Sequence, residues 1–222
     1  MEELKTKNLY QNRSVWGLTI LFMCTGILSF AQSPPDSHPY LVEITAFQKE
    51  MNEQYGNPET TILKEKQLQA FKEAGGHSFF TVDSSYRFEA SLEVFSEPER
   101  IRMSTNLWMK ADFDIYGKAS FSLAGNPVNL LIYKLVSLEE KEGSEDYLFL
   151  PFKDLTAGKE TYGGGRYIDL KIPEDASSII IDFNKAYNPY CAYSLKYVCP
   201  IPPKENLIEH EIRAGIKYVK FR

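Results

Sequence analysis

The hydrophobic period of this chain changes at Gly75-Gly76, and that change limits the folds open to it. Before the change, apolar residues recur every three or four positions over about 40–55 and 63–74, which predicts two amphipathic helices. Pro39 suits a first helical turn, and Gly56 and Gly75 suit helix ends. After the change, apolar and polar residues alternate, as they do in half-buried strands.

The alternating part of the chain predicts several short strands separated by turns. We expect strands at 86–94, 113–123, 128–135, 147–152, 166–172 and 179–183, and a hairpin over 207–221 that bends at Ala214-Gly215. Two helices followed by such strands indicate one α+β domain, mainly antiparallel β, with two N-terminal helices. The pattern fits either a sandwich or a partly open barrel.

The first 31 residues differ from the rest of the chain. Three basic residues precede an uncharged apolar run over 15–31, which ends in Ser29-Phe30-Ala31. We predict a signal peptide over 1–31, a flexible tether over 32–39, and a single domain over 40–222. Export would place the protein in the periplasm or on the cell surface, without stable membrane insertion. An uncleaved N-terminal membrane anchor is the alternative, because 17 apolar residues approach the length that spans a bilayer.

Charge and motifs exclude several classes of protein. The 25 basic and 30 acidic residues give a net charge of −5, which argues against a nucleic-acid-binding protein. The sequence has no G-x-S-x-G elbow, no phosphate-binding loop and no H-E-x-x-H motif. We therefore expect no cofactor and no metal. A binding or accessory protein is favoured over an enzyme.

Two cysteines remain after the predicted leader, Cys191 and Cys199, because Cys24 lies within it. In an oxidising compartment, two cysteines eight positions apart predict a disulfide. A free or redox-active thiol pair, or half of a metal site, are the alternatives. The scattered histidines do not supply the remaining ligands at a zinc-like spacing.

Two polar and aromatic loops, 153–166 and 184–199, are the places where we expect ligand-binding residues. Arg166 could grip an anionic group, and the tyrosines could stack on a sugar-like ligand. The candidate residues are Asp154, Thr161, Tyr162, Arg166, Asp182, Asn184, Tyr187 and Asn188. The alternative is that Arg166 forms a structural clamp with Asp154 or Asp182.

Two other functions stay open at this point. A hydrolase could use two carboxylates among Asp154, Asp169 and Asp182. A purely structural envelope protein would need no small-molecule site. An exposed Arg166 at a pocket floor would favour binding, facing carboxyl groups would favour catalysis, and an Arg166 buried against an aspartate would favour structure.

Three segments resemble a known bacterial family. They are F-K-D-L-T-A-G-K-E-T-Y-G-G-G-R-Y-I-D-L over 152–170, I-D-F-N-K-A-Y-N-P-Y-C-A-Y over 181–193, and C-P-I-P-P-K-E-N over 199–206. These runs are similar to domain of unknown function 1684 (DUF1684), and the short exported form resembles members from Bacteroidota. One departure is Ile216, which precedes Lys217 where the family usually has an acidic residue.

The resemblance implies little about activity, because DUF1684 has no assigned function. It places the candidate loop residues and both cysteines inside family motifs. It also bears on the disulfide, since relatives without a leader carry both cysteines. In a reducing compartment these cysteines would need a role other than a disulfide.

Overall fold

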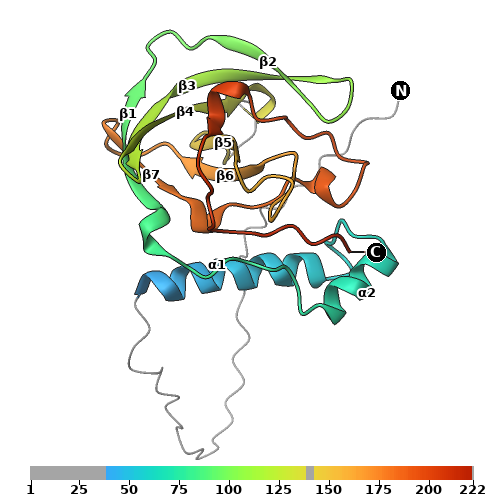
Figure 1. The fold of residues 1–222 in the computed structure, drawn as a ribbon. Helices are drawn as coiled ribbons and strands as arrows, with labels where there is room; N and C mark the ends of the chain where they lie inside the picture. Colours follow the sequence, from blue (N-terminus) through green and yellow to red (C-terminus); the bar gives the residue numbers. More distant parts are fainter. Residues whose placement is uncertain (1–38, 139–142, 222) are drawn as a thin grey trace, which may run out of the picture. The chain divides into compact units, whose positions relative to one another are not determined.

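The computed structural model describes residues 39–138 and 143–221 (Figure 1). The predicted signal peptide and the tether up to residue 38 lie outside the described residues. Among those described, no helix has both the length and the apolar character needed to cross a membrane.

Both helices form where the apolar spacing predicts them. Helix α1 spans Pro39–Gly56 and α2 spans Glu65–Glu73. Their buried rings, Tyr55 and Phe71, pack with Tyr193 and Phe221 in a cluster that links the helices to segments following the strands. The helices are therefore anchored by residues more than 100 positions away along the chain.

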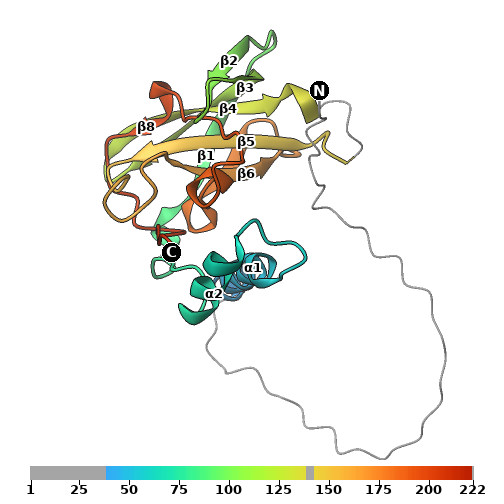
Figure 2. The same cartoon turned by 90° about the vertical axis from the view of Figure 1, so that its right-hand side faces the viewer.

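Eight strands form the sheet, and all pairings except that of β8 with β5 are antiparallel. The strands are β1 (Arg87–Val94), β2 (Arg100–Ser104), β3 (Lys110–Leu123), β4 (Asn126–Leu135), β5 (Tyr147–Asp154), β6 (Arg166–Lys171), β7 (Ser178–Asp182) and β8 (Leu207–Ile208). The main order is β6-β5-β4-β3-β1-β7. The sheet curls into a half-barrel (Figures 1 and 2), so the α+β class and the partly open barrel are confirmed.

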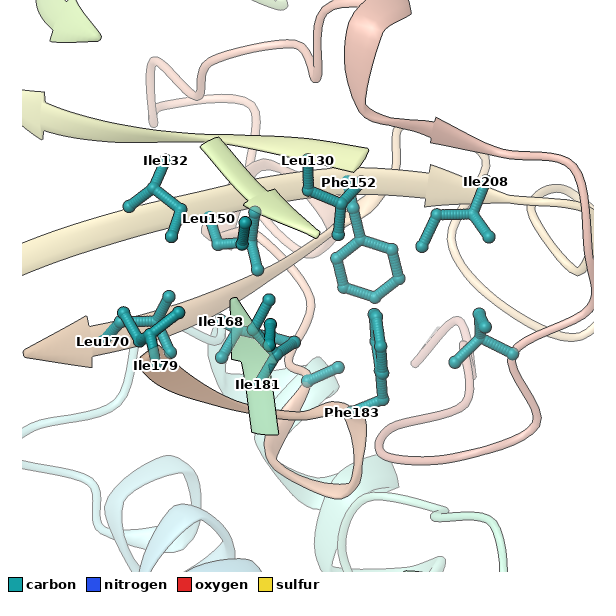
Figure 3. Packing of buried hydrophobic residues seen from close by; sticks show 14 of the residues in the cluster. Leu130, Ile132, Leu150, Phe152, Ile168, Leu170, Ile179, Ile181, Phe183 and Ile208 are labelled. Carbon is teal, nitrogen blue, oxygen red and sulfur yellow. The ribbon is translucent and has the colours of Figure 1, made fainter. Parts of the chain in front are cut away.

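Strand alternation separates the two faces of the curled sheet. Leu148, Leu150 and Phe152 of β5 lie in the inner core, where they pack against residues of β4, β6 and β7 (Figure 3). The neighbouring Tyr147 and Phe149 belong instead to a second cluster on the outer face. This outer cluster also contains Met103, Phe113, Tyr133, Tyr167, Cys191 and Cys199.

Two parts of the sheet differ from the expectation. Strand β2 was not predicted, although Arg100–Ser104 alternates polar and apolar residues as a strand should. The predicted hairpin over 207–221 is wrong, since β8 covers only Leu207–Ile208 and the chain beyond it is irregular. The reason is that the carbonyl groups of Ile212, Ala214 and Ile216 bind a buried arginine rather than a neighbouring strand.

Candidate functional site

Arg166, at the start of β6, is buried inside the domain with 1% of its surface exposed. Its Nη2 donates to Asp154 Oδ1 at 3.1 Å and to the Ile212 carbonyl at 2.8 Å. Its Nη1 donates to the carbonyls of Ala214 at 2.5 Å and Ile216 at 3.3 Å. Of the two clamps considered from the sequence, the structure contains the one with Asp154, and the guanidinium presents no donor to the surface.

The second oxygen of Asp154 completes this buried network. Asp154 Oδ2 accepts hydrogen bonds from the Thr156 amide at 3.1 Å, the Thr156 hydroxyl at 2.7 Å and the Ile212 amide at 2.9 Å. The buried Thr161 hydroxyl lies 2.9 Å from that of Thr156. Asp154, Thr161 and Arg166 thus act together to tie the loop after β5 to residues 212–216.

The predicted Asp182, Asn184 and Asn188 are also buried and satisfy other parts of the chain. Asp182 accepts the Asn184 amide at 2.9 Å and the Tyr40 hydroxyl at 2.9 Å, which fastens α1 to the end of β7. Asn188 Nδ2 donates to the Tyr193 hydroxyl at 2.8 Å. These three side chains therefore hold loops and the first helix in place.

The three carboxylates of the hydrolase hypothesis have separate surroundings. Asp154 binds Arg166, and Asp182 binds Tyr40 and Asn184. Asp169 instead accepts hydrogen bonds from two tyrosines on the outer face. Within the described part of the chain, no two of these aspartates share a hydrogen-bond partner.

Asp169 has the arrangement expected of a ligand-binding carboxylate. The hydroxyls of Tyr147 and Tyr187 both donate to its Oδ1, at 2.8 and 2.6 Å. Its Oδ2 has no hydrogen-bond partner among the described residues, and the side chain is exposed. Desolvation by the surrounding protein nevertheless raises the pKa of Asp169 above its usual range. The two tyrosines therefore hold an exposed carboxylate at the edge of the outer cluster.

Half-buried tyrosines belong to the same outer cluster as Tyr147 and Tyr187, the two partners of this carboxylate. Tyr147, Tyr162, Tyr187, Tyr190 and Tyr197 all pack against the outer cluster while keeping part of their surface exposed. We call Asp169 and these five residues the tyrosine recess. Burial raises the pKa of Tyr187 well above its usual value, and the charge of Asp169 contributes to the same shift.

Loop 184–199 contacts β6 directly after loop 153–166. The backbones of Tyr167 and Tyr187 exchange two hydrogen bonds of 2.9 Å, which bring the start of β6 against the segment that follows β7. Their rings meet edge to face with centroids 5.9 Å apart. Of the predicted ligand residues, Tyr187 contacts Asp169 and Tyr162 is half-buried in the same outer cluster, whereas the other six are buried in the networks described above.

Cys191 and Cys199 lie in the outer cluster as free thiols. The Cys191 amide donates to Cys199 Sγ at 3.2 Å, so the two residues are in direct contact. The predicted disulfide is not formed in this structure and stays a prediction. Among the described residues, no group of three or more His, Cys, Asp or Glu side chains is placed to hold a metal ion.

The sequence carried a signal for Asp169 that composition alone does not reveal. In β6, Arg166, Ile168 and Leu170 share one face, and the two aliphatic residues mark that face as the inner core. Asp169 shares the opposite face with Tyr167. Strand alternation therefore predicts a buried arginine and an aspartate among tyrosines, once the inner face is known.

The sequence profile described as "Protein of unknown function (DUF1684)" matches residues 69–217. The chain belongs to the DUF1684 family. Among solved structures, it is similar to the solution NMR structure of an uncharacterized protein from Haloarcula marismortui, with 29% sequence identity and a TM-score of 0.62. That similarity covers 81% of this chain and 94% of the archaeal chain. No curated protein matches.

The DUF1684 match includes the Arg166 network, the tyrosine recess and both cysteines. It begins within α2, so α1 lies outside the matched residues. The comparisons assign no activity to the family, and the Bacteroidota type and export stay predictions.

Proposed function

We propose that this DUF1684 protein is a binding or accessory module of the cell envelope that holds a small sugar-like ligand in the tyrosine recess. The observation that carries the proposal is the Asp169 carboxylate, which has one oxygen fixed by two phenols and the other without a hydrogen-bond partner in the described part of the chain. Such a fixed acceptor costs little further ordering when a ligand donates to it.

The chemistry of the recess favours a neutral or amine-bearing polyol. Ligand hydroxyl or ammonium groups can donate to Asp169 Oδ2, and tyrosine rings offer apolar faces with polar edges. An anionic ligand is disfavoured at this position, because the two groups that hydrogen-bond to Asp169 are uncharged phenols. The ligand anchor is therefore Asp169 rather than Arg166, whose guanidinium is held by Asp154 and backbone carbonyls.

Export remains part of this proposal, since the protein would encounter an envelope sugar outside the cytoplasm. The predicted cleavage after Ala31 would leave Gln32 as the first residue. Mass spectrometry of the protein recovered from its host checks this, and a different mature N-terminus would contradict the assigned site.

The ligand is tested by calorimetric titration with glucose, N-acetylglucosamine, glucosamine and gluconate. We expect binding of at least one of the first three and none of gluconate. Asp169→Asn keeps an acceptor for the tyrosines but turns the unpartnered oxygen into an amide donor, so the affinity should fall about tenfold or more. Glu174→Gln, an exposed neighbour outside the recess, should leave the affinity unchanged.

The stability of the Asp169→Asn variant separates a lost ligand contact from a lost fold. Because the folded pKa of Asp169 is raised, its ionised form destabilises the native state as pH rises through that pKa. At neutral pH the variant should therefore melt at or above the wild-type temperature while binding more weakly. The absence of binding by all three uncharged or amine-bearing sugars, or equal affinity in the variant, would overturn the proposal.

A further inference from the structure

The two cysteines form a pair that the proposed ligand site does not use. Cys191 and Cys199 have 7% and 6% of their surface exposed, and the Cys191 amide points at Cys199 Sγ from 3.2 Å. Buried thiols are usually isolated among apolar side chains and inert. Here each thiol has the other as its neighbour.

The backbone on both sides of the pair is fixed. Asn106 lies in the turn between β2 and β3. Its side-chain oxygen accepts a hydrogen bond from the Cys199 amide at 2.6 Å, and its backbone amide donates to the Cys199 carbonyl at 3.0 Å. Cys191 is held in a short 3-10 turn over Tyr190–Ala192. Two fixed backbones keep the sulfur atoms close without a covalent bond, which is the arrangement that favours bond formation over separation.

The surroundings make the two thiols unequal. Hydrogen bonds from Cys199 and then from Tyr162 lower the pKa of Cys191. The same contact with Cys191, together with burial, raises the pKa of Cys199 far above its usual value. The thiolate is the nucleophilic form of cysteine, and the hydrogen bond from the Tyr162 phenol stabilises it at Cys191, so we take Cys191 as the attacking group.

We propose that Cys191 and Cys199 form a reversible dithiol–disulfide site that reacts with small peroxides. In the first step, the Cys191 thiolate attacks one peroxide oxygen; an S–O bond forms, the O–O bond breaks, and hydroxide leaves and takes up a proton as water. In the second step, Cys199 sulfur attacks the sulfenic acid of Cys191. The S–O bond breaks, the S–S bond forms, and the departing hydroxide takes the Cys199 proton to give a second water.

The electron balance of this sequence is complete with peroxide as the oxidant. Two thiols lose two electrons in total, and one hydrogen peroxide is reduced to two waters. A small oxidant is required because both cysteines are nearly buried. A dithiol reductant returns the pair to the structure described here.

The experiment uses the full chain with Cys24→Ser, so that Cys191 and Cys199 are its only cysteines. After exposure to one equivalent of hydrogen peroxide, free thiols are alkylated and the protein is digested with trypsin. Cleavage after the exposed Lys196 separates the two cysteines into different peptides, which stay joined only through a disulfide. We expect this joined pair, and its loss after dithiothreitol.

Single variants test the roles of the two thiols. In Cys199→Ser, a sulfenic acid at Cys191 should accumulate and be captured by dimedone. In Cys191→Ser, Cys199 should react more slowly than Cys191 does in Cys199→Ser, because burial still raises the pKa of Cys199 while the hydrogen bond from Tyr162 still lowers that of Cys191. Tyr162→Phe, which removes a hydrogen bond to Cys191, should slow the first step while leaving disulfide formation possible.

The wild-type pair provides a result that depends on no variant. A joined peptide that arises between two molecules, or overoxidised cysteines without a joined peptide, would overturn the proposal. Equal reaction rates for the two single-cysteine proteins would overturn the assignment of Cys191 as the attacking thiol. None of these outcomes depends on whether the tyrosine recess binds a sugar.

Discussion

Through its ion pair with Asp154 and its hydrogen bonds to residues 212–216, Arg166 joins the end of β5 to the C-terminal segment. Both side chains are almost completely buried, and their N–O distance is 3.1 Å. Burial makes the pair costly to form but more costly to break, because a single remaining charge has no water to solvate it. Arg166 is therefore a structural centre, although its glycine-flanked position in the sequence suggested a ligand anchor.

We predict that Asp154→Ala lowers the free energy of unfolding by about 3–5 kcal/mol, as expected when one partner of a buried ion pair is removed. Urea denaturation measures the change. The control is Glu160→Ala, which breaks an ion pair with Arg213 of the same 3.1 Å length but with side chains 39% and 56% exposed. Its cost should stay below about 1 kcal/mol, and comparable losses in the two variants would contradict the buried-pair account.

His77 gives the domain a sensitivity to acid. Burial among aromatic rings lowers its pKa from 6.5 to about 4. The unfolded chain therefore binds a proton below pH 6.5 that the folded protein refuses, and stability is lost as pH falls from about 6.5 to about 4. The loss approaches about 1.4 kcal/mol per pH unit in that window.

Chemical denaturation at several pH values between 7 and 4 measures this effect. His77→Phe keeps an aromatic ring against Tyr55, which the imidazole meets edge to face at 4.4 Å. The stability of this variant should fall less steeply with acid than that of the wild type. An identical pH dependence would show that other groups cause the acid sensitivity.

At the scale of elements, the long strand β3 serves both faces of the sheet because of one irregularity. Its pairing with β4 shifts between Ile115 and Gly117. Before the shift, Phe113 and Ile115 contribute to the outer cluster; after it, Ala119 and Leu123 contribute to the inner core. A one-residue shift changes which face a side chain occupies, so β3 supports both the recess side and the barrel interior.

The turn between β3 and β4 contains a residue in a strained conformation. Ala124 has a φ of 49° and Gly125 a φ of 82°, the left-handed pair that a two-residue hairpin turn requires. Asparagine tolerates this conformation better than alanine. We predict that Ala124→Asn raises the free energy of unfolding by up to about 1 kcal/mol, as measured by urea denaturation.

The matched variant for this turn is Ala124→Val. A β-branched side chain is disfavoured at positive φ, so it should destabilise the protein. The hypothesis fails if both substitutions change stability in the same direction.

The elements show what local pattern can and cannot predict. Helix α1 and strands such as β1 were predictable because their apolar spacing agrees with their final environment. Strand β2 was missed because five residues give little periodicity, with Ile101 and Met103 as its only apolar positions. The hairpin expected over 207–221 was wrong because Ile212 and Ile216 alternate like strand residues but are buried around Arg166.

At the scale of the whole molecule, residues 214–216 are buried with little space around their backbone. Gly215 has a φ of 74°, and a Cβ atom placed on it would lie 2.5 Å from the Phe183 carbonyl oxygen and 2.8 Å from that of Ala186. Gly158 has a similar φ of 81°, but nothing lies within 4 Å of its Cβ position. A substitution at Gly158 therefore introduces backbone strain alone, whereas one at Gly215 introduces both strain and crowding.

We predict that Gly158→Ala costs about 1–2 kcal/mol, the price of a left-handed alanine alone. Gly215→Ala carries the same strain and must also displace two backbone carbonyls, so it should be clearly more destabilising or leave the protein unfolded. Thermal unfolding of both variants, followed by circular dichroism, measures the difference. Equal melting temperatures would show that residues 212–216 can move aside.

The candidate site could be predicted only in part, because it depends on which long-range contacts form. The sequence indicated the two loops, and loop 184–199 does contact the chain immediately after loop 153–166, through Tyr187 and Tyr167. Alternation along β6 places Arg166 and Asp169 on opposite faces, but it does not indicate which partners each of them meets. Those partners are set by the curl of the whole sheet and by the carbonyls of Ile212, Ala214 and Ile216, neither of which is encoded in the local pattern.

Arg166 takes three of its hydrogen-bond partners from residues 212–216, and this has a consequence for biosynthesis. All eight described strands lie before residue 209, so a ribosome can complete them while the guanidinium still lacks the carbonyls of Ile212, Ala214 and Ile216. A nascent chain of that length contains an unmatched cation that opposes closure of the core. We therefore expect the domain to reach its native state only after residues 212–216 have left the ribosome, with the core open until then.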